Sequence, residues 1–385
     1  MSSEFFTVSS RAAALHRLRE FLERVPRYAH QRNFDRVGHP DVSRLSPWIR
    51  YRVISEEECV KAVLEAHSFE ASEKFVQELM WRTYWKGWLD LRPRVWTNYL
   101  RDLDGLRSEY LSNKDFTAAS RGETRLSFFN DWVNELVTTG YLHNHTRMWF
   151  ASVWIFTLQL PWQLGAEFMY RHLFDGDPAS NTLSWRWVAG LQTKGKLYIA
   201  RPDNIAKYSE GRWAPRANEL NVEPKAPVSD DVGPPQPLSP VLEGLVPEGS
   251  CVLVHDDDLS VDLSPEVSGR GARFCVLGRD LSERAERVGA FVNQLRGDAQ
   301  NRMNAESVVG VNEVERWTSD HGARCLYAMR PRCGYETPML ERLHRELHER
   351  GIELIFLRRD WDSKYYRFAQ SGYFPFWNSV KKDLR

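Results

Sequence analysis

The sequence changes its periodicity near the middle, and this change constrains the fold more than any other feature. Residues 10 to about 215 carry apolar residues at helical spacing almost throughout, with few alternating stretches. After residue 249, short apolar segments of strand length alternate with helical patterns. Such alternation predicts a small parallel sheet covered by helices. We therefore expect a mostly α protein in which a helical domain is followed by a small α/β domain.

The expected sheet consists of four short apolar segments, at 251–255, 272–278, 323–329 and 352–358. Helical patterns near 281–296 and 336–350 separate some of them. The glycine-containing stretch at 268–273 is no nucleotide-binding motif and is predicted to be a loop. A proline-rich, acidic segment lies between the two halves and predicts a linker. The expected domains are therefore 1–213, 214–249 and 250–385.

Charge and cysteine content exclude some function classes and leave others open. The 52 basic and 52 acidic residues give a formal net charge of zero, so total charge provides no argument for nucleic-acid binding. Basic residues between Arg44 and Arg94 offer a local phosphate-binding surface, for which an ordinary solvated face is the alternative. The five cysteines show no metal-ligand spacing and no CxxC pair, so we expect reduced thiols, no metal and a cytoplasmic location.

Aromatic residues raise a second question. The 15 tryptophans exceed what a core of this size needs, which suggests stacking surfaces or redox work for some and packing for most. The longest apolar run, at 148–160, is too short to span a bilayer. We expect it to be a buried core helix, and we expect no membrane association.

The stretch DGDPASN at 175–181 carries the most unusual combination of side chains. Asp177 before Pro178 predicts a helix start, with the aspartate as N-cap and proline at the first helical position. Asn181 and Trp185 then fall four residues apart on one helix face. Asp175 lies before the helix, where it can meet a basic partner or a ligand. Alone, such a turn is usually only a capped helix.

Three further segments make a ligand site the better interpretation. The loop at 43–46 (SRLS) offers hydroxyls and backbone amides suited to a pyrophosphate. The segment at 77–85 (QELMWRTYW) places Glu78, Trp81 and Arg82 on one helix face. A surface salt bridge over core tryptophans is the alternative for that helix. The segment at 140–152 (GYLHNHTRMWFAS) adds histidines, an asparagine and an arginine.

Together these four segments resemble the flavin-binding catalytic domain of the DNA photolyase and cryptochrome superfamily. The resemblance covers roughly residues 10–213. That family normally places an α/β antenna domain before the flavin domain, whereas here the α/β segment follows. The inverted order resembles a bacterial group of short photolyase-like proteins. In that group the C-terminal domain seals the flavin site, and the activity is light-driven repair of pyrimidine dimers in single-stranded DNA.

The resemblance implies FAD as cofactor and assigns its contacts residue by residue. The FAD-binding positions are Tyr28, Ser43, Arg44, Leu45, Ser46, Arg147, Asp175, Gly176, Asp177 and Asn181. Arg147 would pair with Asp175, and the amide of Asn181 would face flavin N5. Trp185 and Trp162 match the first two members of the chain that photoreduces the flavin, and the third position falls at Tyr110, where the family more often has tryptophan.

The resemblance also implies a pocket for the damaged bases. Its members are Glu78, Trp81, Arg82, Asn144, His145, Met148 and Trp187. The two tryptophans would stack against a flipped-out dimer, and Glu78 would hydrogen-bond its bases. Asparagine and methionine, where enzymes for the (6-4) lesion carry histidines, favour cyclobutane dimers. His145 departs from the arginine common in cyclobutane-dimer enzymes, which puts the strength of its contact with phosphate or base in doubt.

The function implied is repair of cyclobutane pyrimidine dimers by electron transfer from excited reduced FAD, with UV-damaged DNA as partner and a monomer as the working form. A blue-light receptor of the cryptochrome type, which binds FAD without repair, is the main alternative, and a scaffold that has lost its flavin is the third.

For the C-terminal domain, three roles remain open: a relocated antenna domain, a lid over the flavin and a DNA-contacting module. No chromophore-binding signature is visible, so no antenna cofactor is expected and the lid is favoured, mostly by the resemblance. The aromatic, basic end at 362–385 is expected to pack on the protein rather than to bind phosphate.

Overall fold

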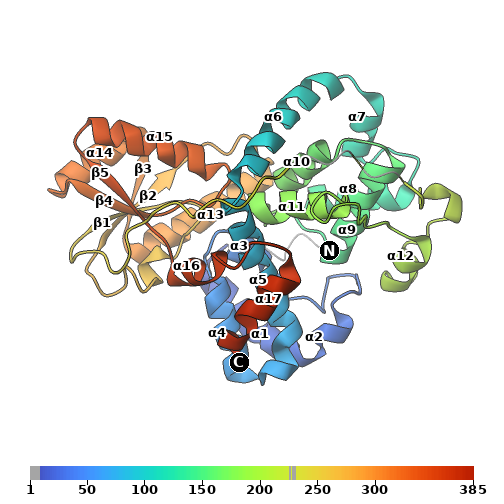
Figure 1. Cartoon of the computed structure of the whole chain (residues 1–385), viewed down its shortest axis with the longest axis horizontal. Helices are drawn as coiled ribbons and strands as arrows, with labels where there is room; N and C mark the ends of the chain where they lie inside the picture. Colours follow the sequence, from blue (N-terminus) through green and yellow to red (C-terminus); the bar gives the residue numbers. More distant parts are fainter. Residues whose placement is uncertain (1–8, 225–226, 228–230) are drawn as a thin grey trace. The chain divides into compact units, whose positions relative to one another are not determined.

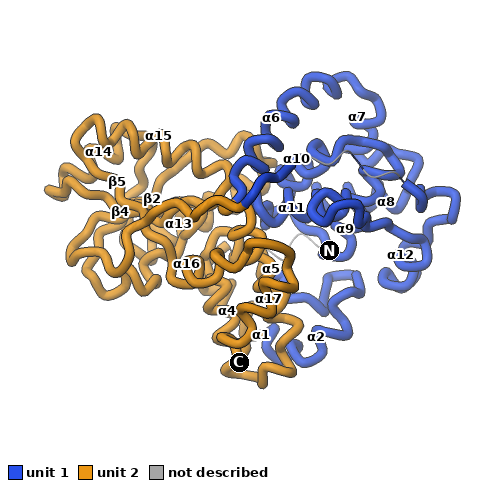
Figure 2. Tube along the Cα trace, in the orientation of Figure 1, with its two compact units in different colours: residues 1–7, 21–44, 92–234 blue, residues 8–20, 45–91, 235–385 orange. Residues whose placement is uncertain are grey.

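The computed structural model describes residues 9–224, 227 and 231–385 (Figure 1). The chain groups into two compact units, each assembled from separate stretches of sequence (Figure 2). The first unit comprises described residues of Phe21–Arg44 and Arg92–Pro234. The second comprises Leu45–Leu91 and Pro235–Arg385 together with the N-terminal stretch up to Glu20. The division at 1–213, 214–249 and 250–385 stays a prediction.

The first unit is helical, and its described residues form no strand. Its helices are α2 (Val25–Gln31), α6 (Pro93–Tyr110), α7 (Lys114–Arg121), α8 (Ser127–Thr139), α9 (Asn144–Ser152), α10 (Trp162–His172), α11 (Pro178–Val188) and α12 (Pro202–Tyr208). A short 3-10 turn, Ala217–Glu219, follows α12. A buried aromatic core holds the unit together, with Trp132, Trp149 and Trp154 all fully buried.

The apolar run at 148–160 is buried, as predicted, but it is not one continuous α-helix. It begins within α9 and passes into a π-helical turn at Val153–Thr157. The turn ends at Leu158, and Gln159 takes a left-handed backbone conformation with φ of 54°. Hydrophobicity alone does not reveal such a change of helical pitch, because residues 148–160 are apolar almost throughout and show no periodicity that would distinguish the two helix types.

The second unit contains the sheet and the remaining helices. Its helices are α3 (Ser46–Arg50), α4 (Glu56–Ala66), α5 (Phe69–Asp90), α13 (Glu286–Met303), α14 (Gly310–Asp320), α15 (Glu336–Glu349), α16 (Asp360–Tyr366) and α17 (Tyr373–Val380), and most of α1 (Arg11–Leu22) belongs to it. Two 3-10 turns, Val261–Leu263 and Lys381–Leu384, complete it. Ser55 and Glu58 form a capping box at the start of α4.

The sheet has five parallel strands in the order β3-β2-β1-β4-β5. The four predicted strands are present as β1 (Cys251–Val254), β2 (Arg273–Gly278), β4 (Cys325–Met329) and β5 (Glu353–Leu357). The fifth, β3 (Glu306–Val309), was not predicted, because only Val308 among its four residues is buried. An edge strand with one buried position gives too little hydrophobic pattern to be recognised. The helix expected from 281 begins only at Glu286.

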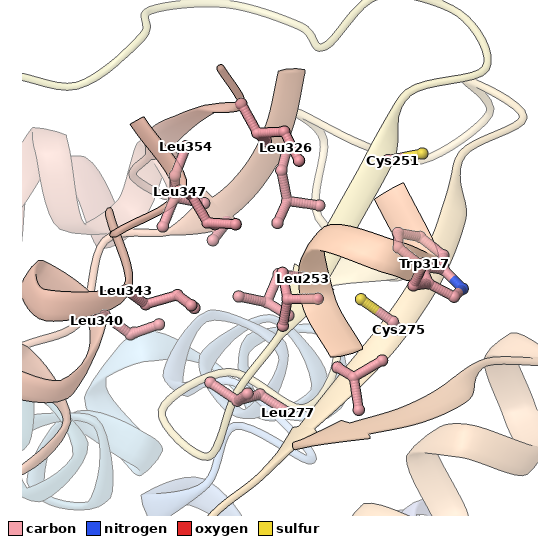
Figure 3. Close-up of a cluster of buried hydrophobic side chains, with 14 of the residues drawn as sticks. Cys251, Leu253, Cys275, Leu277, Trp317, Leu326, Leu340, Leu343, Leu347 and Leu354 are labelled. Atoms are coloured by element: carbon pink, nitrogen blue, oxygen red, sulfur yellow. The ribbon is translucent and has the colours of Figure 1, made fainter. Parts of the chain in front are cut away.

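One face of the sheet is covered by α14 and α15 (Figure 3). Leu253 of β1 and Cys275 of β2 point into this layer, against Trp317 of α14 and Leu343 of α15. The helix α13 connects β2 to β3, whereas α14 and α15 belong to connections that run in the opposite direction along the sheet. It therefore lies on the other face of the sheet (Figure 1). The structure therefore confirms a mostly helical protein with a small α/β part. None of the described helices is long and apolar enough to span a membrane.

Candidate functional site

The turn DGD at 175–177 is held in one conformation by hydrogen bonds at both ends. Asp177 is the N-cap of α11, and its Oδ1 accepts from the backbone N–H of Ser180 at 2.7 Å. Gly176 donates its own N–H to the carbonyl of Leu173. Both aspartates are buried. The predicted cap is confirmed, and two carboxylates are fixed beside the N-terminal end of α11, where the helix dipole favours negative charge.

Arg147 and Asp175 form the pair expected from the sequence. The guanidinium Nη1 lies 3.0 Å from Asp175 Oδ1, while Nε donates to the carbonyl of Leu142 at 2.9 Å. The guanidinium also lies over the ring of Tyr141, 5.3 Å from its centroid. Burial raises the pKa of Tyr141 to about 12, so its hydroxyl stays protonated beside the ion pair.

Asn181 and Trp185 share a face of α11, as predicted, and both contact α10. The Nδ2 of Asn181 donates to the carbonyl of Ala166 at 2.7 Å, which leaves Oδ1 as the acceptor end of the amide. Trp185 is buried, and its ring meets that of Trp154 edge to face at 6.3 Å. Gly165 of α10 allows the Trp185 ring to lie this close to α10, because a Cβ at residue 165 would lie 2.3 Å from that ring.

The other two residues expected in the tryptophan chain lie in the same unit. Trp162, the first residue of α10, is buried, and its ring stacks on that of Tyr99 at 5.6 Å. Tyr99 in turn lies 5.2 Å from the ring of Trp96. Tyr110, at the end of α6, is half-buried, and its ring contacts Phe116 at 6.4 Å. The order of electron transfer among these rings stays a prediction.

The residues expected to hold the phosphates and ribose lie in α2 and in the loop before α3. Tyr28 is buried in α2, edge to face with Phe21. In the SRLS loop, Arg44 adopts a left-handed conformation with φ of 54°, which is uncommon for a residue other than glycine. Leu45 is fully buried, and the carbonyl of Ser46 accepts from Arg82 at 3.4 Å. Ser43 is half-buried.

Helix α5 brings together the acidic, aromatic and basic residues predicted at helical offsets. Glu78 lies 3.1 Å from Lys74, one turn earlier. Trp81 is half-buried, and its ring lies 5.1 Å from that of Trp85. Its closest ring contact is with Tyr373 of α17, at 3.6 Å. Tyr373 was not among the predicted site residues, because its contact with α5 links positions almost 300 residues apart.

The remaining predicted lesion contacts lie in the first unit. Asn144 is exposed at the start of α9, and Met148 is half-buried one turn later. Trp187 is half-buried against Tyr198, with ring centroids 5.6 Å apart. His145 is buried, and burial lowers its pKa, so the imidazole is neutral near pH 7. It therefore lacks the positive charge that an arginine would place there.

A buried acid–histidine cluster in the first unit escaped sequence reasoning. His39 lies between Asp35, at 3.1 Å, and Glu135, at 3.0 Å. The ring of His143 stacks on it at 5.8 Å, and burial lowers the pKa of His143 to about 3. Arg212 completes the cluster 2.9 Å from Asp35. The spacing of Asp35 and His39 was visible in the sequence, but their partners come from distant segments.

Comparison with known proteins gives these residues a family context. A family model described as the FAD binding domain of DNA photolyase matches residues 75–212. The matched range contains most of α5, including Glu78 and Trp81, as well as Arg147 and the DGD turn. It ends close to the residue 213 at which the sequence predicted the helical domain to end.

Named relatives of the chain include photolyases, in agreement with the family model. Deoxyribodipyrimidine photo-lyases from Synechococcus sp. and Thermus thermophilus are 30% and 32% identical to the chain over 240 and 234 residues. These matches cover 58% and 57% of this chain, but only 48% and 53% of the two relatives. The chain therefore spans about half the length of the curated relatives it matches.

Among solved structures, a bacterial class III photolyase from Agrobacterium tumefaciens is 26% identical, with 52% of this chain and 43% of that chain covered at a TM-score of 0.44. The family assignment comes from the matched flavin domain and from the named relatives. The matched flavin domain therefore places residues 75–212 in the DNA photolyase and cryptochrome superfamily.

Proposed function

We propose that this protein repairs cyclobutane pyrimidine dimers in DNA, using light and bound FAD, with a preference for single-stranded DNA. The observation that carries the proposal is the position of Glu78 and Trp81 one turn apart on α5. A carboxylate that accepts hydrogen bonds and an indole that stacks are the two groups needed to hold a flipped-out pyrimidine. Both lie inside the range matched by the photolyase FAD-binding family model.

The residues of the DGD turn fit a flavin by their chemistry. Asp175, compensated by Arg147, and Asp177, fixed as a cap, offer buried carboxylates for hydroxyl and N–H groups of a ligand. The amide of Asn181 is oriented through Nδ2, so its Oδ1 would accept from a flavin N–H. Tyr28 and the loop Ser43–Ser46 would hold the ribose and phosphates. Bound FAD would supply the light absorption and the transferred electron.

The protein's own contribution is position and electrostatics. Trp81 and Trp187 would provide the stacking area for the dimer, and Glu78 would accept hydrogen bonds from its bases. Arg82, Asn144, Met148 and His145 would complete the pocket. Since His145 is neutral, we propose that it contributes shape and a hydrogen bond rather than a phosphate contact. Asparagine and methionine in this pocket favour cyclobutane dimers over (6-4) lesions, whose repair calls for a proton donor.

We also propose that the α/β part, residues 250–385, acts as a lid over the flavin, that no antenna cofactor is bound, and that the working form is a cytoplasmic monomer. Deleting residues 240–385 would then weaken FAD retention. Because α5 and the sheet belong to the same compact unit, that deletion needs a folding control by circular dichroism. Release of bound chromophores by denaturation, followed by chromatography, would identify any second cofactor.

The proposal is tested by blue-light repair of a thymine dimer in a single-stranded oligonucleotide, with a dark control and a duplex of the same sequence. Glu78→Gln is expected to slow repair at least tenfold. Glu70→Gln, at an exposed position in the first turn of the same helix, should leave repair unchanged. Light-dependent loss of the dimer in the wild type, reduced only in the first variant, would support the assignment.

The second candidate, a blue-light receptor, predicts a different result. In that case the protein binds FAD and the flavin photoreduces, while the dimer persists under all conditions. The third candidate, a scaffold without flavin, predicts no retention of FAD by the purified protein. The three outcomes are separated by measuring FAD content, photoreduction and dimer loss on one preparation.

A further inference from the structure

Trp81 does not stand alone on α5, because the first residue of α17 lies flat against it. The rings of Trp81 and Tyr373 are 3.6 Å apart between centroids and inclined by only 8°. Rings this close and this nearly parallel overlap almost face to face and share a large contact area. Tyr373 is buried, whereas Trp81 keeps part of its side chain exposed.

Tyr373 is itself anchored at several points. Its hydroxyl donates to the carbonyl of Gln77 at 2.7 Å, one turn before Trp81 on the same helix. Tyr84 meets the Tyr373 ring edge to face at 5.5 Å, and the Tyr84 hydroxyl donates to the carbonyl of Ser371 at 2.6 Å. The two hydrogen bonds and the ring contact hold residues 371 and 373 against α5, so the stacked ring has a fixed position.

We propose that Tyr373 is a positioning residue for recognition of the damaged base, holding the indole of Trp81 in a fixed plane. This inference rests on the proposed function, in which a flipped-out pyrimidine stacks on Trp81. A side chain that is ordered before binding loses less conformational freedom when the ligand arrives, so affinity rises without any new contact to the ligand. Tyr373 would act in this way through Trp81 and without touching the base.

A gate that swings away from Trp81 is the opposite arrangement, and the contacts of Tyr373 argue against it. Releasing the ring would expose a buried side chain and break the hydrogen bond to Gln77. A movable residue would be expected to resemble its neighbour Phe374, which is 69% exposed. Tyr373 instead has the burial and hydrogen bonding of a structural support.

The test compares three variants by two separate quantities. The first is the dissociation constant for a single-stranded oligonucleotide with one thymine dimer. The second is the repair rate at saturating oligonucleotide. Tyr373→Leu is expected to weaken binding about three- to tenfold, the loss typical of one aromatic pair, while the saturated repair rate changes less than twofold. Tyr373→Phe retains the stacked ring and should stay within about twofold of the wild type. Phe374→Leu is the control and should bind like the wild type.

The possible outcomes distinguish a failure of this inference from a failure of the proposed function. If Trp81→Ala weakens binding but Tyr373→Leu does not, the positioning role is wrong and the proposed function stands. Tighter binding by Tyr373→Leu would indicate a gate and overturn the inference. If Trp81→Ala has no effect, the lesion role of Trp81 and the positioning role both fail. In the double variant, loss of Tyr373 should add little to loss of Trp81, since the two act as one unit.

A measurement on the wild type covers the case in which Tyr373→Leu does not fold. Amide hydrogen exchange of residues 373–380 is followed with and without saturating dimer oligonucleotide. A support predicts equal or slower exchange in the complex, because α17 keeps its contacts. Faster exchange of this segment in the complex would mean that the helix is released on binding, and the positioning role would be wrong.

Discussion

Asp257 lies 2.8 Å from the guanidinium of Arg50, and both side chains are buried. The aspartate lies three residues after the end of β1 and belongs to a run of three, Asp256 to Asp258, at the carboxyl edge of the parallel sheet. Asp256 is paired bidentately with Arg296, and Asp258 with Arg359. In doubly wound sheets this edge is where ligands commonly bind. Here the guanidinium groups of the same compact unit neutralise the carboxylates.

Replacing Asp257 with asparagine should therefore destabilise the second unit strongly. Burial raises the pKa of Asp257, but Arg332 and Arg50 outweigh burial and hold it well below its usual range. The change removes the buried carboxylate that pairs with both Arg50 and Arg332, and breaking such a buried ion pair costs about 3–5 kcal/mol. Urea unfolding would measure the loss. As control, Glu346→Gln removes an ion pair whose Arg342 side chain is 74% exposed, and should cost no more than about 0.5 kcal/mol. Equal losses would contradict the prediction.

The run of three aspartates also shows why sequence reasoning found the sheet but not its charged edge. The strand CVLV was readable because four consecutive apolar residues followed a proline-rich segment. The partners of the following aspartates come from α3, α13 and the segments after β4 and β5, and nothing local to Asp257 identifies Arg50 as its partner. Periodicity predicts which residues are buried, whereas ion pairing depends on contacts between distant segments.

His39 should make stability fall as pH rises above the unfolded histidine pKa of about 6.5. Burial alone would lower its pKa, but the carboxylates of Asp35 and Glu135 outweigh burial and raise it. Because the folded-state pKa lies above the unfolded value of about 6.5, the contribution of His39 is fully present below that value. It is lost as pH rises through the folded pKa. His39→Gln should cost about 1.5–3 kcal/mol at pH 6, where a charge-assisted hydrogen bond to Glu135 and an ion pair with Asp35 are removed.

The difference between wild type and His39→Gln should shrink when urea unfolding is repeated at pH 9. Asp35 does not titrate across this interval, since His39, His143 and Arg212 outweigh its burial and bring its pKa to about 2. The neighbouring His143 is neutral throughout. A stability difference that stays constant from pH 6 to pH 9 would mean that His39 is not protonated in the folded protein.

The DGD turn was the part of the site most accessible from sequence. Its cap, its proline and the spacing to Asn181 and Trp185 are local features, and each leads to one geometry. The contact between Trp185 and Gly165 was not accessible, because it joins two helices. A glycine within a predicted helix looks merely unfavourable until the neighbouring ring is known.

Gly165→Ala should displace Trp185. The added Cβ would lie 2.3 Å from the Trp185 ring and 2.9 Å from Nε1 of Trp154, so the indoles must move. Overpacking of this kind costs about 1–3 kcal/mol, and photoreduction of the bound flavin should slow. Gly105→Ala in α6, where nothing lies within 4 Å of the new Cβ, is the control and should stabilise by up to about 1 kcal/mol. Similar effects of the two variants would show that the Trp185 contact is unimportant.

Under the proposed function, photoreduction of the flavin should also reveal which residue follows Trp162 in the electron-transfer chain that the resemblance implies. The Trp162 ring stacks on Tyr99 at 5.6 Å, and Tyr99 lies 5.2 Å from Trp96. Tyr110, the position that the family resemblance assigns to the terminal donor, has a ring contact with Phe116 instead. Phenylalanine retains ring packing but is much harder to oxidise than tyrosine. We therefore expect Tyr99→Phe to slow photoreduction under blue light more than Tyr110→Phe does. Each of the two variants removes one hydroxyl group, and each photoreduction rate is divided by the FAD content of the preparation. A larger effect of Tyr110→Phe would instead favour the terminal donor that the resemblance implies.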